Sequence, residues 1–227
     1  CIARTLHAAG CDLALHYHHS AEAMQALCAE LERERAHSTV SMQADLTDCA
    51  ALPVLIEAAV TQFGRLDALV NNASAYFATP LETTTPQQWD ELIAANVRAP
   101  YFLCQAAARH LRESGGAIVN IADIYAERPL PEHAAYSISK AALVMLTKAL
   151  AQELGPDVRV NAIAPGNVLW STNPTKAETA DTVQARTSLA RQGSPEDIAE
   201  AVLYLLRDAR YCSGVVLPVD GGRLLHI

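Results

Sequence analysis

Residues 117–164 read AIVNIADIYAERPLPEHAAYSISKAALVMLTKALAQELGPDVRVNAIA. This stretch holds two largely apolar runs, at 117–122 and 158–164, on either side of a long helix-like segment at 133–154. Continuous rather than alternating apolar runs are typical of strands in a parallel sheet that helices cover on both faces. The stretch therefore predicts a strand–helix–strand unit of an α/β protein.

The same alternation of strand and helix extends over the rest of the chain. Four more strands are expected at 12–18, 38–44, 66–70 and 215–219, with helices between them. The residues expected to cap helices are Ser20, Thr85 and Ser194, and Pro100 is expected to kink one. Six strands in this order, with no linker and no repeat, predict a single domain over residues 1–227 with a doubly wound, mostly parallel sheet.

The amino-acid composition and net charge indicate a globular protein and argue against some kinds of partner. Of the 227 residues 51% are hydrophobic and 19% charged, which is the balance of a globular protein. The net charge of −8 argues against binding to nucleic acid or to an anionic membrane surface. No apolar run approaches the roughly 18 to 20 residues that a membrane span needs. We therefore expect neither nucleic acid nor membrane as a partner.

The six cysteines show no pattern that indicates a disulfide framework or a metal site. None lies in a C-x-x-C pair, and none has zinc-ligand spacing with the eight histidines. We expect reduced thiols in a cytoplasmic protein, and no bound metal.

Three neighbouring strands of the expected sheet end in polar or turn-forming residues. Asp123 follows the strand at 117–122, Asn72-Ala73-Ser74 follow the strand before it, and Pro165-Gly166 follow the strand after it. Ligands of open α/β sheets bind where the carboxyl ends of the strands meet. Each residue alone is explained as a turn, cap or surface residue, but the joint arrangement favours a binding site.

Tyr136 and Lys140 add chemistry to this edge of the sheet. They are four residues apart on the expected helix at 133–154, so both side chains lie on one helical face. A lysine ammonium near a phenol is expected to lower the pKa of the phenol, which then serves as a general acid near neutral pH.

The chain resembles the short-chain dehydrogenase/reductase family, in order and spacing and over essentially its whole length. The matching residues are Asn71-Asn72-Ala73, Asn96, Tyr136, Lys140, Pro165-Gly166 and Asp220-Gly221-Gly222. The resemblance implies a Rossmann-type sheet, a nicotinamide cofactor and hydride transfer. It implies Tyr136 as proton donor, Lys140 as the residue that holds the nicotinamide ribose, and Asn96 as support for a water-linked proton relay. Family members are usually tetramers or dimers, and we expect a homotetramer.

One departure from the family lies at the start of the chain. The family has a loop T-G-x-x-x-G-x-G before its first helix, and the N–H groups of that loop hold the pyrophosphate. This chain starts at Cys1 within a helix-like segment. We therefore expect it to be truncated at the N-terminus and to lack the first strand and the Gly-rich loop.

The second departure is Asp123, which stands where the family usually has Ser. Together with Tyr136 and Lys140 it resembles the pteridine reductase subgroup, which reduces dihydropterins, and often dihydrofolate, with NADPH. The segments 16–23, 43–46 and 72–76 also resemble this subgroup. Tyr76 is expected to stack on the pterin, and Ser74 to bind the pterin or a cofactor phosphate.

The expected cofactor is NADPH. NAD specificity usually needs an Asp or Glu at the end of the second strand of the fold, to accept from the ribose 2′-OH. This chain has His18-His19-Ser20 there, a set of imidazoles and a helix start that suits a 2′-phosphate. The further residues expected around the cofactor are Asp45 and Leu46 beside the adenine, Asn72, Ala73, Ser74, Tyr136, Lys140, Pro165 and Gly166.

Two other functions stay open at this point. One is a short-chain reductase that acts on a ketone or a quinone-like carbonyl, although Asp123 in place of Ser argues against the usual carbonyl mechanism. The other is a non-catalytic NAD(P)-binding protein on the same scaffold. The non-catalytic function is disfavoured by the presence of Tyr136, Lys140 and Asn96, because a protein that only binds its cofactor needs no proton relay.

Overall fold

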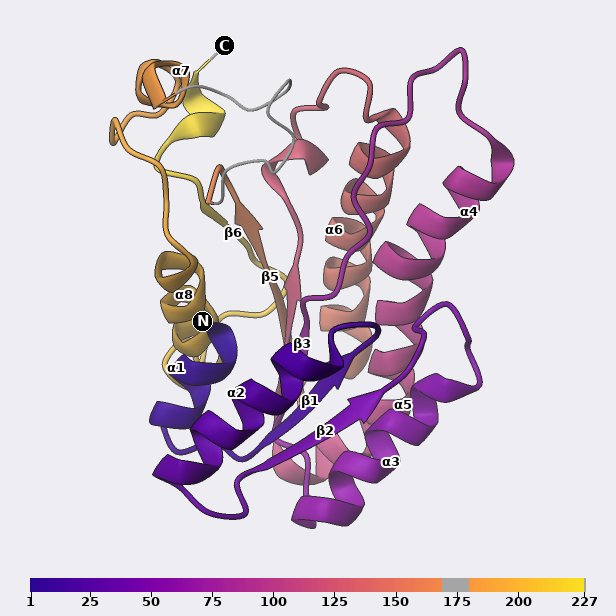
Figure 1. Cartoon of the computed structure of the whole chain (residues 1–227), viewed down its shortest axis with the longest axis vertical. Coiled ribbons are helices and arrows are strands. Elements are labelled where there is room, and N and C mark those ends of the chain that lie inside the picture. Colours follow the sequence, from indigo (N-terminus) through magenta and orange to yellow (C-terminus); the bar gives the residue numbers. More distant parts are fainter. Residues whose placement is uncertain (169–179, 227) are drawn as a thin grey trace.

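The computed structural model describes residues 1–168 and 180–226, and it is an α/β structure (Figure 1). The strands are β1 (Leu13–Tyr17), β2 (Thr39–Gln43), β3 (Ala68–Asn71), β4 (Ala117–Ile121), β5 (Arg159–Pro165) and β6 (Val216–Val219). The helices are α1 (Ile2–Ala8), α2 (Ala21–Glu34), α3 (Ala51–Phe63), α4 (Pro86–Ile93), α5 (Ala99–Ser114), α6 (Ala134–Leu154), α7 (Ala180–Ala185) and α8 (Pro195–Arg207). All six strands predicted from the sequence are present.

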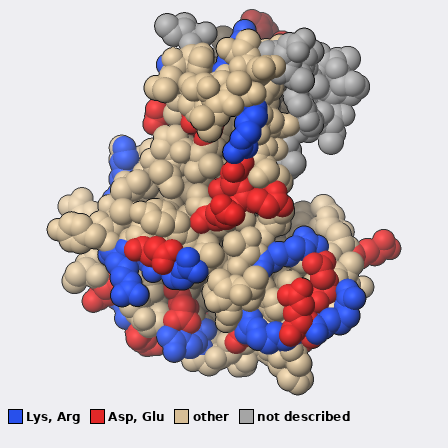
Figure 2. Space-filling model, turned by 90° about the vertical axis from the view of Figure 1, so that its left-hand side faces the viewer, with Lys and Arg blue, Asp and Glu red and all other residues tan. Residues whose placement is uncertain are grey.

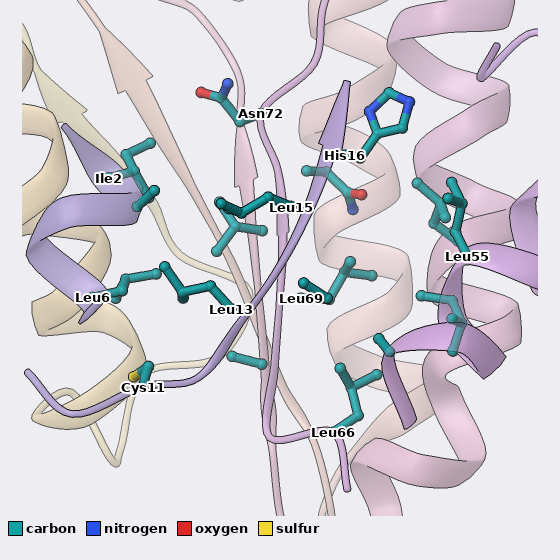
Figure 3. A pocket seen from close by; sticks show the side chains of 18 of the residues that line it. Ile2, Leu6, Cys11, Leu13, Leu15, His16, Leu55, Leu66, Leu69 and Asn72 are labelled. Atoms are coloured by element: carbon teal, nitrogen blue, oxygen red, sulfur yellow. The ribbon is translucent and has the colours of Figure 1, made fainter. Parts of the chain in front are cut away.

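Every strand pair is parallel, as predicted, but the strands form two sheets instead of one. β3, β4, β5 and β6 pair in that order, and β1 pairs with β2. Within the described residues no strand lies between β1 and β3, which border a cavity of about 720 Å³ (Figure 3). Apolar side chains such as Leu15 and Leu69 line this cavity.

Helices cover both faces of the larger sheet, and this explains why its strands are continuously apolar. Ile118 of β4 packs into a core with α3, α5 and α6, whereas the next residue, Val119, packs into a second core with α1 and α8. Figure 1 shows α1 and α8 on one side of the strands and α5 and α6 on the other. Successive side chains of a strand point to opposite faces, so both faces of β4 must be apolar.

Of the three residues predicted to cap helices, two make the expected side-chain hydrogen bonds. Thr85 and Ser194 form capping boxes with Gln88 and Asp197, as their sequence context predicts. Ser20 lies at the predicted N-cap position of α2, but its side chain makes no hydrogen bond to the start of the helix.

The helix expected to kink at Pro100 is interrupted before it, by a π-helix at Ala94–Arg98. Pro100 itself lies in the first turn of α5, where its missing N–H is tolerated.

The surface carries mixed charge. Figure 2 shows acidic and basic side chains interspersed over the lower part of one face. In the part of the chain that the structure describes, no helix has the length and apolar character to cross a lipid bilayer.

A buried chain of polar side chains links β3, β4 and α6. The Asn71 amide donates to Asn120 Oδ1 at 2.8 Å, and the Asn120 amide donates to Thr147 Oγ1 at 2.9 Å. Thr147 Oγ1 in turn donates to the Leu143 carbonyl at 2.9 Å. These groups are buried, so each depends on the next for the hydrogen bonds that water would otherwise provide.

We predict that Asn120→Ala lowers the free energy of unfolding by about 2–4 kcal/mol, because it leaves the Asn71 amide without its acceptor and Thr147 without a donor. Urea unfolding followed by circular dichroism measures this loss. Thr147→Ser is the matched control, since it keeps the hydroxyl group. A loss below about 0.5 kcal/mol in Asn120→Ala would contradict the role of the network.

Candidate active site

The carboxyl end of β4 and the first turn of α6 bring Asp123 and Tyr136 together. Asp123 lies just past β4 and accepts a hydrogen bond from the Tyr125 backbone N–H at 2.9 Å, which caps a short 3₁₀ helix. The Tyr136 hydroxyl donates to Asp123 Oδ2 at 2.7 Å. The two side chains predicted to share one site are therefore in direct contact.

Lys140 lies one turn beyond Tyr136 and is only 3% exposed. Its Nζ donates to the Ile121 carbonyl, the last residue of β4, at 2.9 Å, and lies 5.7 Å from the centroid of the Tyr136 ring. A lysine ammonium has three N–H donors, so one bond to Ile121 leaves donors for the hydroxyl groups of a ribose. This donor set fits the nicotinamide ribose that the family resemblance implies.

Asn96 lies in the π-helix and connects three segments of the site. Its Oδ1 accepts from the Ala75 N–H at 2.8 Å and from Ser74 Oγ at 3.1 Å. Its Nδ2 donates to the Ala75 carbonyl at 3.0 Å and to Ser139 Oγ at 2.9 Å. Asn96 thus joins the segment after β3 to α6, which it contacts at Ser139, the residue before Lys140.

Burial sets the pKa values of the three ionisable groups. It raises the pKa of the Asp123 carboxyl, against the opposing effects of its hydrogen bonds and of Lys140. Burial lowers the pKa of Lys140 to about 8, although the charge of Asp123 works in the other direction. Both shifts follow from the cost of charging a group away from water.

The pKa of Tyr136 lies well above its usual value, because of burial and then of the Asp123 charge and hydrogen bond. The expectation that Lys140 lowers this pKa is therefore wrong for this structure. Asp123 Oδ2 is 2.7 Å from the phenol oxygen, whereas Lys140 Nζ is 5.7 Å from the ring centroid. The negative group that accepts the hydroxyl hydrogen bond, Asp123, stabilises the protonated phenol.

Tyr76 lies beside the Asp123–Tyr136 pair, and it also contacts His133, which was not predicted as a site residue. Its ring meets the Tyr136 ring edge-on, with centroids 4.8 Å apart, and stacks on His133 with centroids 5.1 Å apart. His133 directly precedes α6 and is three residues before Tyr136. That helical spacing is the one signal in the sequence that could have found it.

Apart from Tyr136 and Lys140 on α6, the residues expected around the cofactor lie at or just past the carboxyl ends of strands. These are His18, His19 and Ser20 after β1, Asp45 and Leu46 after β2, Asn72, Ala73 and Ser74 after β3, and Pro165 and Gly166 at the end of β5. Figure 3 shows His16 of β1 and Asn72 at the same end of the cavity. The set is therefore gathered along one edge, which fits an extended dinucleotide.

Local contacts shape two of these positions. The His18 and His19 rings stack with centroids 3.6 Å apart. A Cβ atom on Gly166 would lie 2.7 Å from Asp220 Cα, so only glycine lets the end of β5 approach the Asp220-Gly221-Gly222 segment this closely.

Comparisons with known proteins agree with this geometry. A family model described as enoyl-(acyl carrier protein) reductase matches residues 1–223. A double mutant of a short-chain dehydrogenase/reductase from Serratia marcescens superposes with a TM-score of 0.91 at 37% identity, over 98% of this chain and 91% of that one. The chain belongs to the short-chain dehydrogenase/reductase family. It is accordingly an NAD(P)-dependent oxidoreductase.

Other members of the family that resemble this chain have varied substrates in their names. A Streptomyces violaceoruber protein, 42% identical over 80% of this chain and 75% of its own length, carries the name of a ketoacyl reductase of granaticin polyketide synthase. Pteridine reductase 1 of Leishmania tarentolae is 32% identical over 97% of this chain and 90% of its own length. A blue fluorescent protein from a metagenomic library, solved with NADPH, superposes with a TM-score of 0.90 at 36% identity over 98% and 91% of the two chains.

We predict that Lys140 titrates near pH 8 in the free protein. The chain has three lysines, so an NMR titration of the lysine Cε signals, with Lys140→Arg for assignment, measures this midpoint directly. Asp123→Asn is expected to move the midpoint lower, because removal of the Asp123 charge disfavours the ammonium. A wild-type midpoint near the ordinary 10.5 would show that burial does not act on this group as described.

Proposed function

We propose that this protein reduces dihydropterins, and also dihydrofolate, to the tetrahydro form with NADPH. The observation that carries the proposal is the 2.7 Å hydrogen bond from the Tyr136 hydroxyl to the Asp123 carboxyl. The family usually has a serine at the position of Asp123, where its hydroxyl holds a substrate carbonyl oxygen. A carboxyl group at this place suits a substrate that presents N–H groups and ring nitrogens.

Each residue of the site has a role in this reaction. NADPH, when bound, supplies the hydride. Lys140 donates to the ribose of the nicotinamide and orients it, and Tyr136 gives its hydroxyl proton to the substrate nitrogen. Asp123 orients the Tyr136 hydroxyl through the hydrogen bond that it accepts from it at 2.7 Å. Asn96 keeps Lys140 in place through Ser139 and supports the return of a proton from solvent.

The raised pKa of Tyr136 makes the phenol a weaker acid in the free protein but keeps its proton in place. A phenol with a pKa above its usual value carries its proton throughout the neutral range, so the donor is loaded before substrate arrives. The exposed ring of Tyr76 offers the substrate an aromatic surface beside the donor. Ser74 lies within the same segment and is available to the substrate or to a cofactor phosphate.

The proposed preference for NADPH over NADH rests on the residues after β1. His18, His19 and Ser20 include no carboxylate that would repel a 2′-phosphate. Asp45, after β2, is occupied by hydrogen bonds from the Thr47 N–H and hydroxyl, both at 2.8 Å. We assign Asp45 and Leu46 to the adenine, Asn72 and Ala73 to the adjoining ribose, and Pro165 and Gly166 to the nicotinamide end.

We also propose a cytoplasmic homotetramer. All six cysteines are free thiols, which suits a reducing compartment. Tyr101 and Phe102 on α5 and Ile138 and Met145 on α6 are exposed hydrophobic side chains, which suits a surface that a second subunit covers.

Light scattering after size exclusion is expected to give a tetramer for the wild type and a smaller species for Phe102→Glu/Met145→Glu. Val54→Glu, at an exposed hydrophobic position on α3, is the control and is expected to stay tetrameric. A wild-type monomer would overturn the proposed assembly.

We predict that Tyr136→Phe lowers kcat for dihydrobiopterin by about 10²- to 10⁴-fold, because it removes the proton donor. The Kd for NADPH, measured by fluorescence of the bound cofactor, is expected to change little. Retained turnover in Tyr136→Phe would contradict the role of Tyr136 as donor.

The substrate class is tested by NADPH consumption with dihydrobiopterin, dihydrofolate and a simple diketone, and with NADH as the comparison cofactor. Turnover of the pterins and not of the diketone is expected. In Asp123→Ser, pterin turnover is expected to fall by about 100-fold with NADPH affinity unchanged. Turnover of the diketone alone would keep the family and discard the pterin substrate.

A further inference from the structure

The Tyr76 ring is exposed to solvent yet has a defined neighbour on one face. It is 56% exposed, whereas His133 beneath it is 7% exposed. The two rings are stacked at an interplanar angle of 16°, and the Tyr136 ring stands at 81° to Tyr76. An aromatic ring has two faces, and His133 covers one of them. A flat ligand that stacks on Tyr76 must therefore use the other face.

His133 itself is held firmly. Its Nδ1 lies 2.9 Å from the Pro131 carbonyl, and because a carbonyl only accepts, Nδ1 carries the hydrogen of this bond. The His133 N–H donates to the Leu130 carbonyl at 3.1 Å, and the His133 carbonyl accepts from the Ser137 N–H at 2.9 Å. The imidazole therefore has a fixed position and plane at the start of α6.

The segment that carries Tyr76 is fastened to the same place by Thr79. The Thr79 N–H donates to the Glu132 carbonyl at 2.6 Å, and Thr79 forms a parallel β-bridge with His133. Thr79 Oγ1 accepts from the Ala135 N–H at 3.3 Å, and Thr79 is buried. The backbone clamp at Thr79 and the ring stack at His133 thus join the loop after β3 to the start of α6.

We propose that His133 is a positioning residue for the substrate, and that it acts through Tyr76. The His133 ring holds the Tyr76 ring beside the Asp123–Tyr136 pair, so the site presents a preformed aromatic surface to a flat heterocycle. The identity of that heterocycle as a pterin rests on the proposed function. An unstacked, exposed tyrosine would have to be ordered when the substrate binds, and this ordering weakens binding.

The proposal is tested by KM and kcat for dihydrobiopterin and by the Kd of oxidised biopterin in the presence of NADP. His133→Ala is expected to raise KM and Kd about 3- to 10-fold, the range of an aromatic stacking pair, with kcat nearly unchanged. His133→Phe keeps a flat ring and is expected to restore both values. His133→Asn keeps a hydrogen-bond donor for the Pro131 carbonyl but has no ring, and is expected to behave like His133→Ala.

Two further variants separate the stack from a general loosening of the site. Thr84→Val removes the hydrogen bond from Thr84 Oγ1 to the Pro80 carbonyl in the same loop, touches neither ring nor the Thr79 clamp, and is expected to leave KM and Kd unchanged. Tyr76→Ala is expected to raise KM at least as much as His133→Ala, and the double variant Tyr76→Ala/His133→Ala no more than Tyr76→Ala alone. Additive effects, or a fall in kcat with KM constant, would overturn the proposal.

The two proposals fail in distinguishable ways. A wild type that binds biopterin but does not reduce dihydrobiopterin would end the proposed function, and the Kd series would still decide the role of His133. Unchanged Kd in His133→Ala, with active wild type, would end the role of His133 and keep the pterin substrate. A wild type that neither binds nor reduces the pterins would overturn both.

Discussion

The buried ammonium group of Lys140 is the constraint on which the rest of the site depends. A lysine in the interior is tolerated only where fixed groups replace the water it has lost. Here the Ile121 carbonyl accepts a hydrogen bond from Lys140 Nζ at 2.9 Å. The charge of Asp123 partly offsets the free-energy cost of burying the ammonium group. Both partners come from the end of β4, so the first turns of α6 must pack over that strand end. Asp123 therefore serves two groups at once, as the acceptor of Tyr136 and as a counter-charge for Lys140.

The π-helix completes this arrangement from the other side. The wider helical turn at Ala94–Arg98 carries the Asn96 side chain. Its oxygen and its nitrogen both hydrogen-bond to the loop after β3, and the nitrogen also donates to Ser139 on α6. Asn96 is 21 residues from Ala75 and 43 from Ser139 in sequence, so one amide joins distant segments. Buried and fully bonded, it fixes where Lys140 and Ser74 lie before any ligand arrives.

Much of this fold could be predicted because its signals are local. An apolar run bounded by polar residues marks a strand and its end, and Asp123, Asn72 and Gly166 were placed at one edge for that reason. The direction of the Tyr136 pKa shift could not be predicted in this way. It depends on the burial of the phenol and on its hydrogen bond to Asp123, which helical spacing does not determine. Nor could His133 be distinguished from an ordinary surface histidine, because its stack on Tyr76 joins segments 57 residues apart.

The donor and acceptor pattern of the site bears on which substrate it can take. The Tyr136 proton is already bonded to Asp123, so a ligand must compete for it and also satisfy the carboxyl group that it leaves behind. A carbonyl oxygen can accept from Tyr136, but it offers no donor to Asp123 Oδ2. Asp123 Oδ1 keeps its bond from the Tyr125 N–H, but a buried carboxyl oxygen that loses its donor is costly. A pterin carries ring N–H donors as well as acceptor nitrogens, so it can meet both demands within one plane. That plane suits the aromatic surface of Tyr76, and the requirement for both a donor and an acceptor on a flat ring is the ground on which we propose a pterin and not a simple ketone.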